Sequence, residues 1–247
     1  MLNKILTKVI ARLNSIQGKG WGTATCTHEV KQTLRFAPRP KIVLDVGGNV
    51  GDWTGELLSR SAPEMVYVFE PSRFNQAKLS ERFKLKPNVS ILPFALSDTD
   101  GLGKLFSDAP GSGLASLHHR DLSSHGLSHD ELEEVNLLSF ASFLKHYSID
   151  NIDVLKLDIE GHELSVLQSI PIAFLDNIGV IQFEFGGSNL DSRTYFRDFW
   201  NLLSSRFLFY RVSPIGALPV PKYREQDEHF VTTNYICANR NLLRQLN

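Results

Sequence analysis

A strand that ends in a glycine-rich turn constrains the fold more than any other feature of this sequence. Residues 41–58 read KIVLDVGGNVGDWTGELL, where an apolar run leads into Gly47, Gly48 and Gly51 and a helical pattern follows. Glycine has no Cβ atom, so it allows a tight turn and lets another group approach the backbone closely. The segment therefore predicts a strand, a turn and a helix with a ligand at the turn, although a tight turn without any ligand is the alternative.

The rest of the chain repeats this alternation of strands and helices. Continuous apolar runs, typical of central strands in a parallel sheet, occur at residues 65–71, 89–96, 152–161 and 178–187. Pro93 bends the second run, and helical patterns lie between the strands. The tail holds two extended runs, FLFYRVSP and HFVTTNYICANR, with no helix between them, which predicts an antiparallel pair. The order of elements predicts one α/β domain with a mostly parallel sheet.

Two segments between the strands are less regular. Residues 98–126 are rich in glycine and serine and are expected to form a loop. Its portion Ala109–Arg120 lies between strands that flank the turn, so it could fold over a site as a lid. A strand around Val135–Leu138 should follow, with a helix starting at Ser139 or Ser142, although a capping-box pattern before this strand also suits a helix.

Composition narrows the class of protein. The chain has 247 residues, of which 42% are hydrophobic, with a formal net charge of −1 and a sequence pI near 6.7. This charge gives no field that would hold a polyanion, so we expect no nucleic-acid partner. Cys26 and Cys237 have neither disulfide nor metal spacing and suggest free thiols in a reducing, cytoplasmic compartment.

The N-terminus is expected to be a separate element, with an amphipathic helix and linker over residues 1–22 and a single domain over 23–247. Lys4, Lys8 and Arg12 interrupt any secretory apolar core. One helical face is apolar, through Leu2, Ile5, Leu6, Val9, Ile10, Leu13 and Ile16. Such a face most often packs on the domain, and the alternative is peripheral contact with the inner membrane surface.

Two acidic residues indicate which ligand the turn would bind. Asp45 precedes the first glycine by two residues and disfavours a pyrophosphate, because like charges repel, but suits a cationic group such as a sulfonium. Glu70 ends the next strand, where nucleoside-binding sheets place a carboxylate that accepts from ribose hydroxyls, although a solvated strand end is the alternative. A ligand that combines a nucleoside with a cationic group is S-adenosylmethionine rather than NAD, so the two acidic residues favour S-adenosylmethionine.

Four motifs in order, DVGGNVG, VFEP, PFALSD and IDVLKLDIEGHE, resemble the FkbM family of S-adenosylmethionine-dependent methyltransferases. The stretch KLDIEGHE is similar to the K-x-D-x-E-G-x-E signature of that family. The resemblance implies a Rossmann-like, seven-stranded class I methyltransferase sheet, mostly parallel with an antiparallel last strand and helices on both faces. It also implies O-methylation of a glycan, as in polysaccharide modification, or of a small natural-product acceptor.

Carried over by position, the resemblance implies cofactor-binding residues at the strand ends: Asp45, Gly47, Gly48, Asn49, Gly51, Glu70, Pro71, Ala95, Ser97, Asp98 and Asp158. The turn would hold the methionine end, Glu70 the ribose, and Ala95 to Asp98 the adenine. The chain departs from the family at Gly48, where alanine is usual, and at Ser139, where aspartate is usual. A role for that aspartate is therefore not carried over.

The segment after the fourth strand supplies candidate catalytic residues, Asp158, Glu160 and His162. A hydroxyl becomes a good nucleophile only when it loses its proton, so methyl transfer to oxygen needs a base or a metal. His162 is the local candidate for a proton acceptor, with a surface histidine as the alternative. Asp158 and Glu160, with Glu184, could hold a divalent metal such as Mg²⁺, or could simply cap helices and form salt bridges.

The loop histidines His118, His119, His125 and His129 match no metal-ligand spacing and suggest a solvated loop. Two other functions stay open at this level. An NAD-dependent oxidoreductase or epimerase is disfavoured by Asp45 and by the lack of a Tyr-x-x-x-Lys pair. A non-catalytic cofactor-binding module is disfavoured because acidic residues are retained together at the fourth strand. The expected partner is a small-molecule or glycan acceptor.

Overall fold

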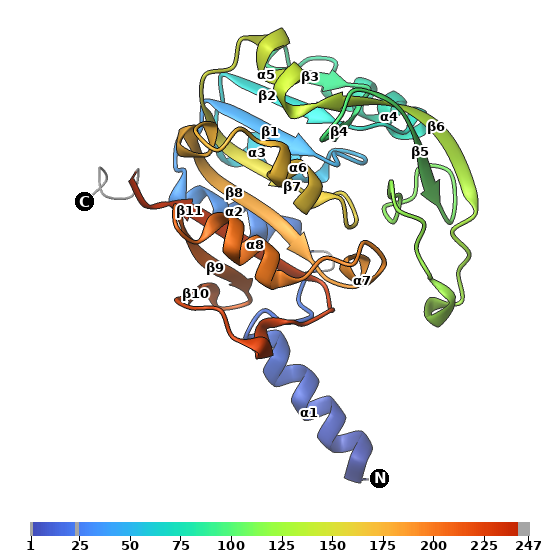
Figure 1. The fold of residues 1–247 in the computed structure, drawn as a ribbon, viewed down its shortest axis with the longest axis vertical. Coiled ribbons are helices and arrows are strands. Elements are labelled where there is room, and N and C mark those ends of the chain that lie inside the picture. The colour runs from blue at the N-terminus through green and yellow to red at the C-terminus, as the bar shows by residue number, and fades with distance from the viewer. Residues whose placement is uncertain (1, 23–24, 242–247) are drawn as a thin grey trace.

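The computed structural model describes residues 2–22 and 25–241 (Figure 1). Its main sheet has eight strands in the order β10-β9-β11-β8-β7-β1-β2-β3. In chain order the bounds are β1 (Ile42–Val46), β2 (Met65–Phe69), β3 (Val89–Leu92), β7 (Ile152–Leu157), β8 (Ile178–Phe185), β9 (Phe207–Ser213), β10 (Gly216–Val220) and β11 (Thr233–Asn239).

The sheet is parallel from β3 to β8 and antiparallel beyond it. Strand β11 lies between β8 and β9 and runs antiparallel to both, which confirms the antiparallel pair predicted for the tail. The predicted number of seven strands is wrong, because β10 pairs with β9 as an eighth strand at the edge. That edge position tolerates Pro219, since a proline has no N–H for a further ladder.

A smaller sheet of β4 (Ala95–Ser97), β6 (Glu131–Ser139) and β5 (Gly101–Ser107) lies beside the main one. The run predicted as one strand over residues 89–96 is split, because Pro93 separates β3 from β4 and each joins a different sheet. The loop predicted over residues 98–126 instead contains strand β5. Its glycine-rich sequence has little strand propensity of its own, and pairing with β6 from Gly101↔Leu137 to Ser107↔Glu131 makes it a strand.

Helices cover both faces of the main sheet, as predicted. One apolar core lies under α5 (Phe140–Tyr147), α6 (Glu163–Ser169) and α8 (Phe196–Leu203), and the other under α2 (Cys26–Phe36), α3 (Asp52–Arg60) and α4 (Arg73–Phe83). The predicted helix start after β6 is confirmed, because Ser139 caps α5 by accepting from the Ser142 N–H. The short elements are α7 (Ser188–Asp191), η1 (Ser123–His125), η2 (Phe174–Asn177) and η3 (Glu225–Asp227).

Helix α1 (Leu2–Ile16) projects from the body of the molecule (Figure 1). Its apolar side chains from Ile5 to Ile16 are about half exposed, with values between 47% and 57%. The expectation that this helix packs on the domain is therefore wrong. Among the helices of the described residues, none is both long and apolar enough to cross a membrane.

Candidate functional site

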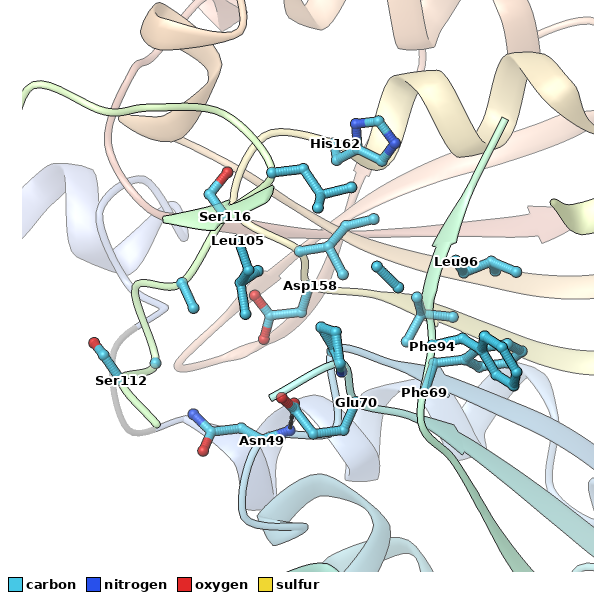
Figure 2. A pocket seen from close by; sticks show the side chains of 18 residues that line it. Asn49, Phe69, Glu70, Phe94, Leu96, Leu105, Ser112, Ser116, Asp158 and His162 are labelled. Carbon is cyan, nitrogen blue, oxygen red and sulfur yellow. Dashed lines mark hydrogen bonds between the residues drawn. The ribbon is translucent and has the colours of Figure 1, made fainter. Parts of the chain in front are cut away.

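A pocket opens at the carboxyl ends of β1, β2 and β7, under the loop that follows β5 (Figure 2). Parallel strands bring their carboxyl ends to one edge of the sheet, so residues far apart in sequence meet there. The predicted site residues that line the pocket are Gly47, Asn49, Glu70, Pro71, Ala95, Asp158 and His162. The remaining predicted residues, Asp45, Gly48, Gly51, Ser97, Asp98, Glu160 and Glu184, lie outside this lining.

The glycines of the turn are needed by the packing of the protein itself. Gly47 has φ +81°, and a Cβ atom there would lie 1.9 Å from the backbone oxygen of Asp158. A Cβ at Gly48 would lie 2.2 Å from Val68 Cγ1. A Cβ at Gly51 would lie 2.5 Å from the Phe83 ring, which belongs to an apolar core and does not line the pocket. The expectation that Gly48 and Gly51 leave room for a ligand is therefore wrong, and only Gly47 borders the pocket.

Asp45 does not reach the pocket, contrary to the sequence-based expectation. Its side chain is fully buried, accepts a hydrogen bond from Thr54 Oγ1 at 2.7 Å and pairs with Lys156 Nζ at 3.0 Å. Burial disfavours the charged form of Lys156, but Asp45 and Asp158 more than offset this effect and raise its pKa. Asp45 therefore neutralises a buried lysine and is not available to a cationic ligand.

Glu70 is held at the pocket wall by two backbone N–H groups. Its Oε2 accepts from Asn49 N at 2.7 Å (Figure 2). Its Oε1 accepts from Ser72 N at 2.9 Å. Burial raises the pKa of Glu70 to about 7, against the opposing effect of these two bonds. A carboxylate has about four acceptor positions. The Asn75 side chain also acts on this carboxylate, so at least one position remains for a ligand with hydroxyl groups.

Apolar side chains that the sequence analysis missed form a wall beside Glu70. They are Phe69, Phe94, Leu96 and Leu105 (Figure 2). Such residues carry no signal that separates a pocket wall from ordinary core, because both are read as apolar strand positions. Ala95 lies among them as predicted. Ser97 and Asp98 do not, because Ser97 Oγ donates to Asp98 Oδ1 at 3.0 Å and faces His162.

His162 borders the pocket, but both of its ring nitrogens are already engaged. Nε2 lies 3.0 Å from Ser97 Oγ, and Nδ1 lies 3.2 Å from His118 Nε2. Burial, together with the neighbouring His118, lowers the pKa of His162 to about 4, so the ring is neutral near pH 7. A neutral, fully hydrogen-bonded imidazole with this pKa is a weak proton acceptor. The geometry therefore disfavours His162 as the base and leaves Asp158 as the accessible carboxylate.

The carboxylates of Asp158, Glu160 and Glu184, which the sequence analysis named as candidate metal ligands, lie close together, and of the three only Asp158 lines the pocket. Each offers one carboxylate oxygen, and these oxygens all lie within 4.8 Å of one another. Burial raises the pKa of Glu160 to about 8, and burial with the nearby Asp158 raises that of Glu184 well above its ordinary value. Oxygen ligands at this spacing suit a divalent cation.

The loop over residues 109–120 covers the pocket, as the lid interpretation predicted. Ser116 exchanges backbone hydrogen bonds with Phe106, and its Oγ donates to the Glu160 carbonyl at 2.7 Å. Arg120, which sequence analysis missed, pairs with the Glu160 carboxylate and lies 3.6 Å from Asp191. The sequence signal that could have identified it is a single arginine at the end of the glycine- and serine-rich segment 109–120. His129 contradicts the expected solvated loop, because it is 2% exposed and accepts from Arg120 N.

Comparisons with known proteins agree with this architecture. A family model described as the FkbM methyltransferase domain matches residues 45–212, which is more than half of the chain. The comparison with curated proteins found no match.

Three solved structures illustrate the similarity at low identity. Methyltransferase FkbM from Methylobacillus flagellatus KT is 15% identical with a TM-score of 0.47, over 79% of this chain and 43% of that one. N-methyltransferase NodS from Bradyrhizobium japonicum WM9, in complex with S-adenosyl-l-homocysteine, is 10% identical with a TM-score of 0.45, over 87% and 85%. An rRNA methylase from Streptococcus thermophilus is 14% identical with a TM-score of 0.41, over 81% and 86%. The chain thus spans less than half the length of the first of these.

Proposed function

The chain belongs to the FkbM methyltransferase family, and we propose that it transfers a methyl group from S-adenosylmethionine to a hydroxyl oxygen of a glycan or a small natural product. One observation carries the proposal. A buried glutamate with free acceptor positions, an apolar wall and the carboxylate of Asp158 line one pocket at the strand ends, and Glu160 and Glu184 lie close to Asp158. These groups suit the three parts of the cofactor, namely a ribose, a flat aromatic base and a cationic sulfonium.

Each part of the cofactor has a matching group. Glu70 would accept from the ribose hydroxyls, since its two backbone bonds leave acceptor positions toward the pocket. Phe94 and Leu96 would contact the adenine. Asp158, at the other side of the turn, would lie near the sulfonium. Net negative charge at that end favours a cation over the pyrophosphate of NAD.

The chain's own residues would orient the acceptor and take up its proton. The bound cofactor supplies an electrophilic methyl group on a sulfonium. In-line displacement requires oxygen, carbon and sulfur to be nearly collinear, and a lid that closes over the pocket helps to hold them so. The acceptor oxygen would form its bond to the methyl carbon as the carbon–sulfur bond breaks. We assign the acceptor proton to Asp158, whose side chain is 42% exposed at the pocket.

A divalent cation such as Mg²⁺ fits the three-carboxylate cluster as a part of this proposal. Burial, together with the negative charge of neighbouring carboxylates, raises the pKa values of Glu160 and Glu184, and a bound cation would offset the repulsion between these carboxylates. Asp158, Glu160 and Glu184 would hold the ion, which would lower the pKa of a nearby hydroxyl. Mg²⁺ should raise the melting temperature of the wild type and leave that of Glu184→Gln unchanged, and an equal rise in both would reject this site.

Calorimetric titration with S-adenosylhomocysteine tests the cofactor. The wild type should bind with a micromolar Kd, and Glu70→Gln should bind at least about tenfold more weakly, since a lost charge-assisted bond is worth ~1.5–3 kcal/mol. Glu29→Gln is the matched control, because Glu29 is also a buried glutamate with two hydrogen bonds and a pKa of about 7.

NAD is titrated in parallel. Tight binding of NAD, or no binding of either ligand, would overturn the cofactor assignment. Labelled methyl transfer to glycan and small hydroxylated acceptors then tests the chemistry. A product methylated on nitrogen would overturn the assignment to oxygen.

A further inference from the structure

We propose that α1 is a membrane anchor that lies on the surface of an anionic lipid bilayer. The helix has 15 residues and exposes a continuous apolar face. Ile5, Leu6, Val9, Ile10, Leu13 and Ile16 are each about half exposed, although side chains of these types are usually buried. A face of this size on a helix that projects from the body needs a partner.

The charge on α1 identifies the partner. Lys4, Lys8 and Arg12 follow one another at four-residue spacing, so they form a single row along the helix beside the apolar face. The helix has no acidic residue, and the first one in the chain is Glu29. The whole chain has a net charge of −1, so positive charge is concentrated at this end. An apolar face beside a purely basic row complements the headgroups and acyl boundary of an anionic leaflet.

A second copy of the chain fits this helix less well. The apolar residues cover positions beyond the narrow seam of a coiled coil, because Ile5 and Ile10 flank the row of Leu6, Val9 and Leu13. The helix is about two heptads long, which is short for a stable two-stranded coiled coil. Pairing would also place two purely basic rows beside one interface, without acidic residues to offset them.

The segment after α1 fixes where the anchor leaves the body. Arg211 Nη1 donates to the Gln17 carbonyl at 3.4 Å, and Gly20 N donates to Thr233 Oγ1 at 3.4 Å. Trp21 forms a bridge with Thr233, which begins β11. The next residue of β11, Asn234, is paired in register with Glu184 of the carboxylate cluster. The anchor is therefore tied to the same edge of the sheet as the pocket, and a bound membrane would lie near that edge.

Flotation with vesicles tests the anchor on the full chain without any cofactor, so its outcome is independent of the methyltransferase assignment. The wild type should bind vesicles of phosphatidylglycerol and phosphatidylcholine, and bind pure phosphatidylcholine vesicles much more weakly. The variant Lys4→Gln/Lys8→Gln/Arg12→Gln should lose about 100-fold in partition coefficient, since each basic residue near an anionic surface contributes about fivefold. Raising the salt concentration should weaken wild-type binding.

A matched control removes the same number of charges elsewhere. Lys78, Lys86 and Lys145 are exposed and form no salt bridge among the described residues. The variant with glutamine at these three positions should bind anionic vesicles within about threefold of the wild type. An equal loss in this control would overturn the proposal, because binding would then follow net charge alone.

A second variant, Leu6→Gln/Val9→Gln/Leu13→Gln, removes apolar area and keeps every charge. It should also lose vesicle binding by at least about tenfold, since each of these side chains would otherwise enter the bilayer boundary. Because the three side chains are exposed, the melting temperature should not change. An unchanged value would show that the body of the protein stays folded. A wild-type protein that does not bind anionic vesicles would overturn the proposal. So would a dimer in sedimentation that this variant converts to a monomer.

Discussion

At the scale of single residues, one buried lysine organises the base of the pocket. Lys156 Nζ lies 3.0 Å from Asp45 Oδ1 and 3.5 Å from Asp158 Oδ2, and it donates to the Gly47 carbonyl at 2.9 Å. The lysine therefore joins the end of β7 to the turn after β1. Gly47 completes this junction, because its bare Cα lets the backbone of Asp158 approach.

Replacing Gly47 by alanine should lower the free energy of unfolding by on the order of 3 kcal/mol, from positive φ and from the clash with Asp158. Gly126 is the matched control, because it has φ +71° and a Cβ added there would meet no atom within 4 Å. Gly126→Ala should cost only about 1–2 kcal/mol. Urea titrations of both variants measure the difference, and equal losses would show that the approach of Asp158 is unimportant.

His162 should make stability depend on pH. Its pKa is about 4 in the folded protein and 6.5 for an ordinary histidine, so the unfolded chain binds more protons between these values. Stability should therefore fall as the pH decreases from 6.5 to 4, by about 3 kcal/mol at most for this group. His162→Gln should lack this component. Urea titrations from pH 4 to 7 compare the two proteins, and parallel curves would refute the assignment.

At the scale of elements, the smaller sheet and its loop form the cover of the pocket. Strands β5 and β6 extend beyond the main sheet, and the loop after β5 returns across the strand ends (Figure 1). The loop is fixed to the turn after β7 through Ser116 and Arg120. That turn includes Glu160 with φ +52° and is itself held by Glu163, which accepts from the N–H groups of Ile159 and Gly161.

Arg120→Met should loosen this cover without unfolding the sheet. Removing one partner of a buried ion pair destabilises its surroundings by ~3–5 kcal/mol. Hydrogen exchange at the Ser116 amide, which donates to the Phe106 carbonyl at 2.9 Å, should therefore accelerate at least about tenfold. Arg73→Met is the control, because the Arg73 side chain is 80% exposed beside Glu133. Equal exchange rates at the Ser116 amide in both variants would contradict a role of Arg120 in holding the loop over the pocket.

At the scale of the whole molecule, the N-terminal segment and the last strand are linked. Strand β11 fills the gap between β8 and β9, so the sheet is complete only when the end of the chain is in place. The residues after α1 attach to the start of that strand through Trp21 and Thr233. Among the side chains that the structure describes in helix α1, those of residues 3–16, none belongs to either apolar core.

Removal of residues 1–16 should therefore change the melting temperature by no more than about 2 °C, as for surface changes in general. Removal of residues 1–22 also deletes Trp21 and the bridge to Thr233. The loss of a partly buried aromatic side chain should lower the melting temperature by about 4–8 °C, for a cost of about 2 kcal/mol. Calorimetric scans measure both truncations, and a large drop with the shorter one would show that α1 stabilises the body.

Local sequence patterns account for the elements that depend on neighbouring residues. The parallel strands, the helices between them and the start of α5 at Ser139 follow from local periodicity and capping. The convergence of Glu70, Asp158 and Glu184 at one edge follows from their positions at strand ends, because parallel strands end together.

Local patterns could not predict which side chains face the pocket, because the orientation of each side chain depends on partners far away in the sequence. Asp45 was expected at the ligand but is paired with Lys156, and His162 was expected as a base but is engaged by Ser97 and His118. Strand β5 exists because β6 pairs with it. Long-range pairing and burial set these outcomes, and neither leaves a local pattern in the sequence.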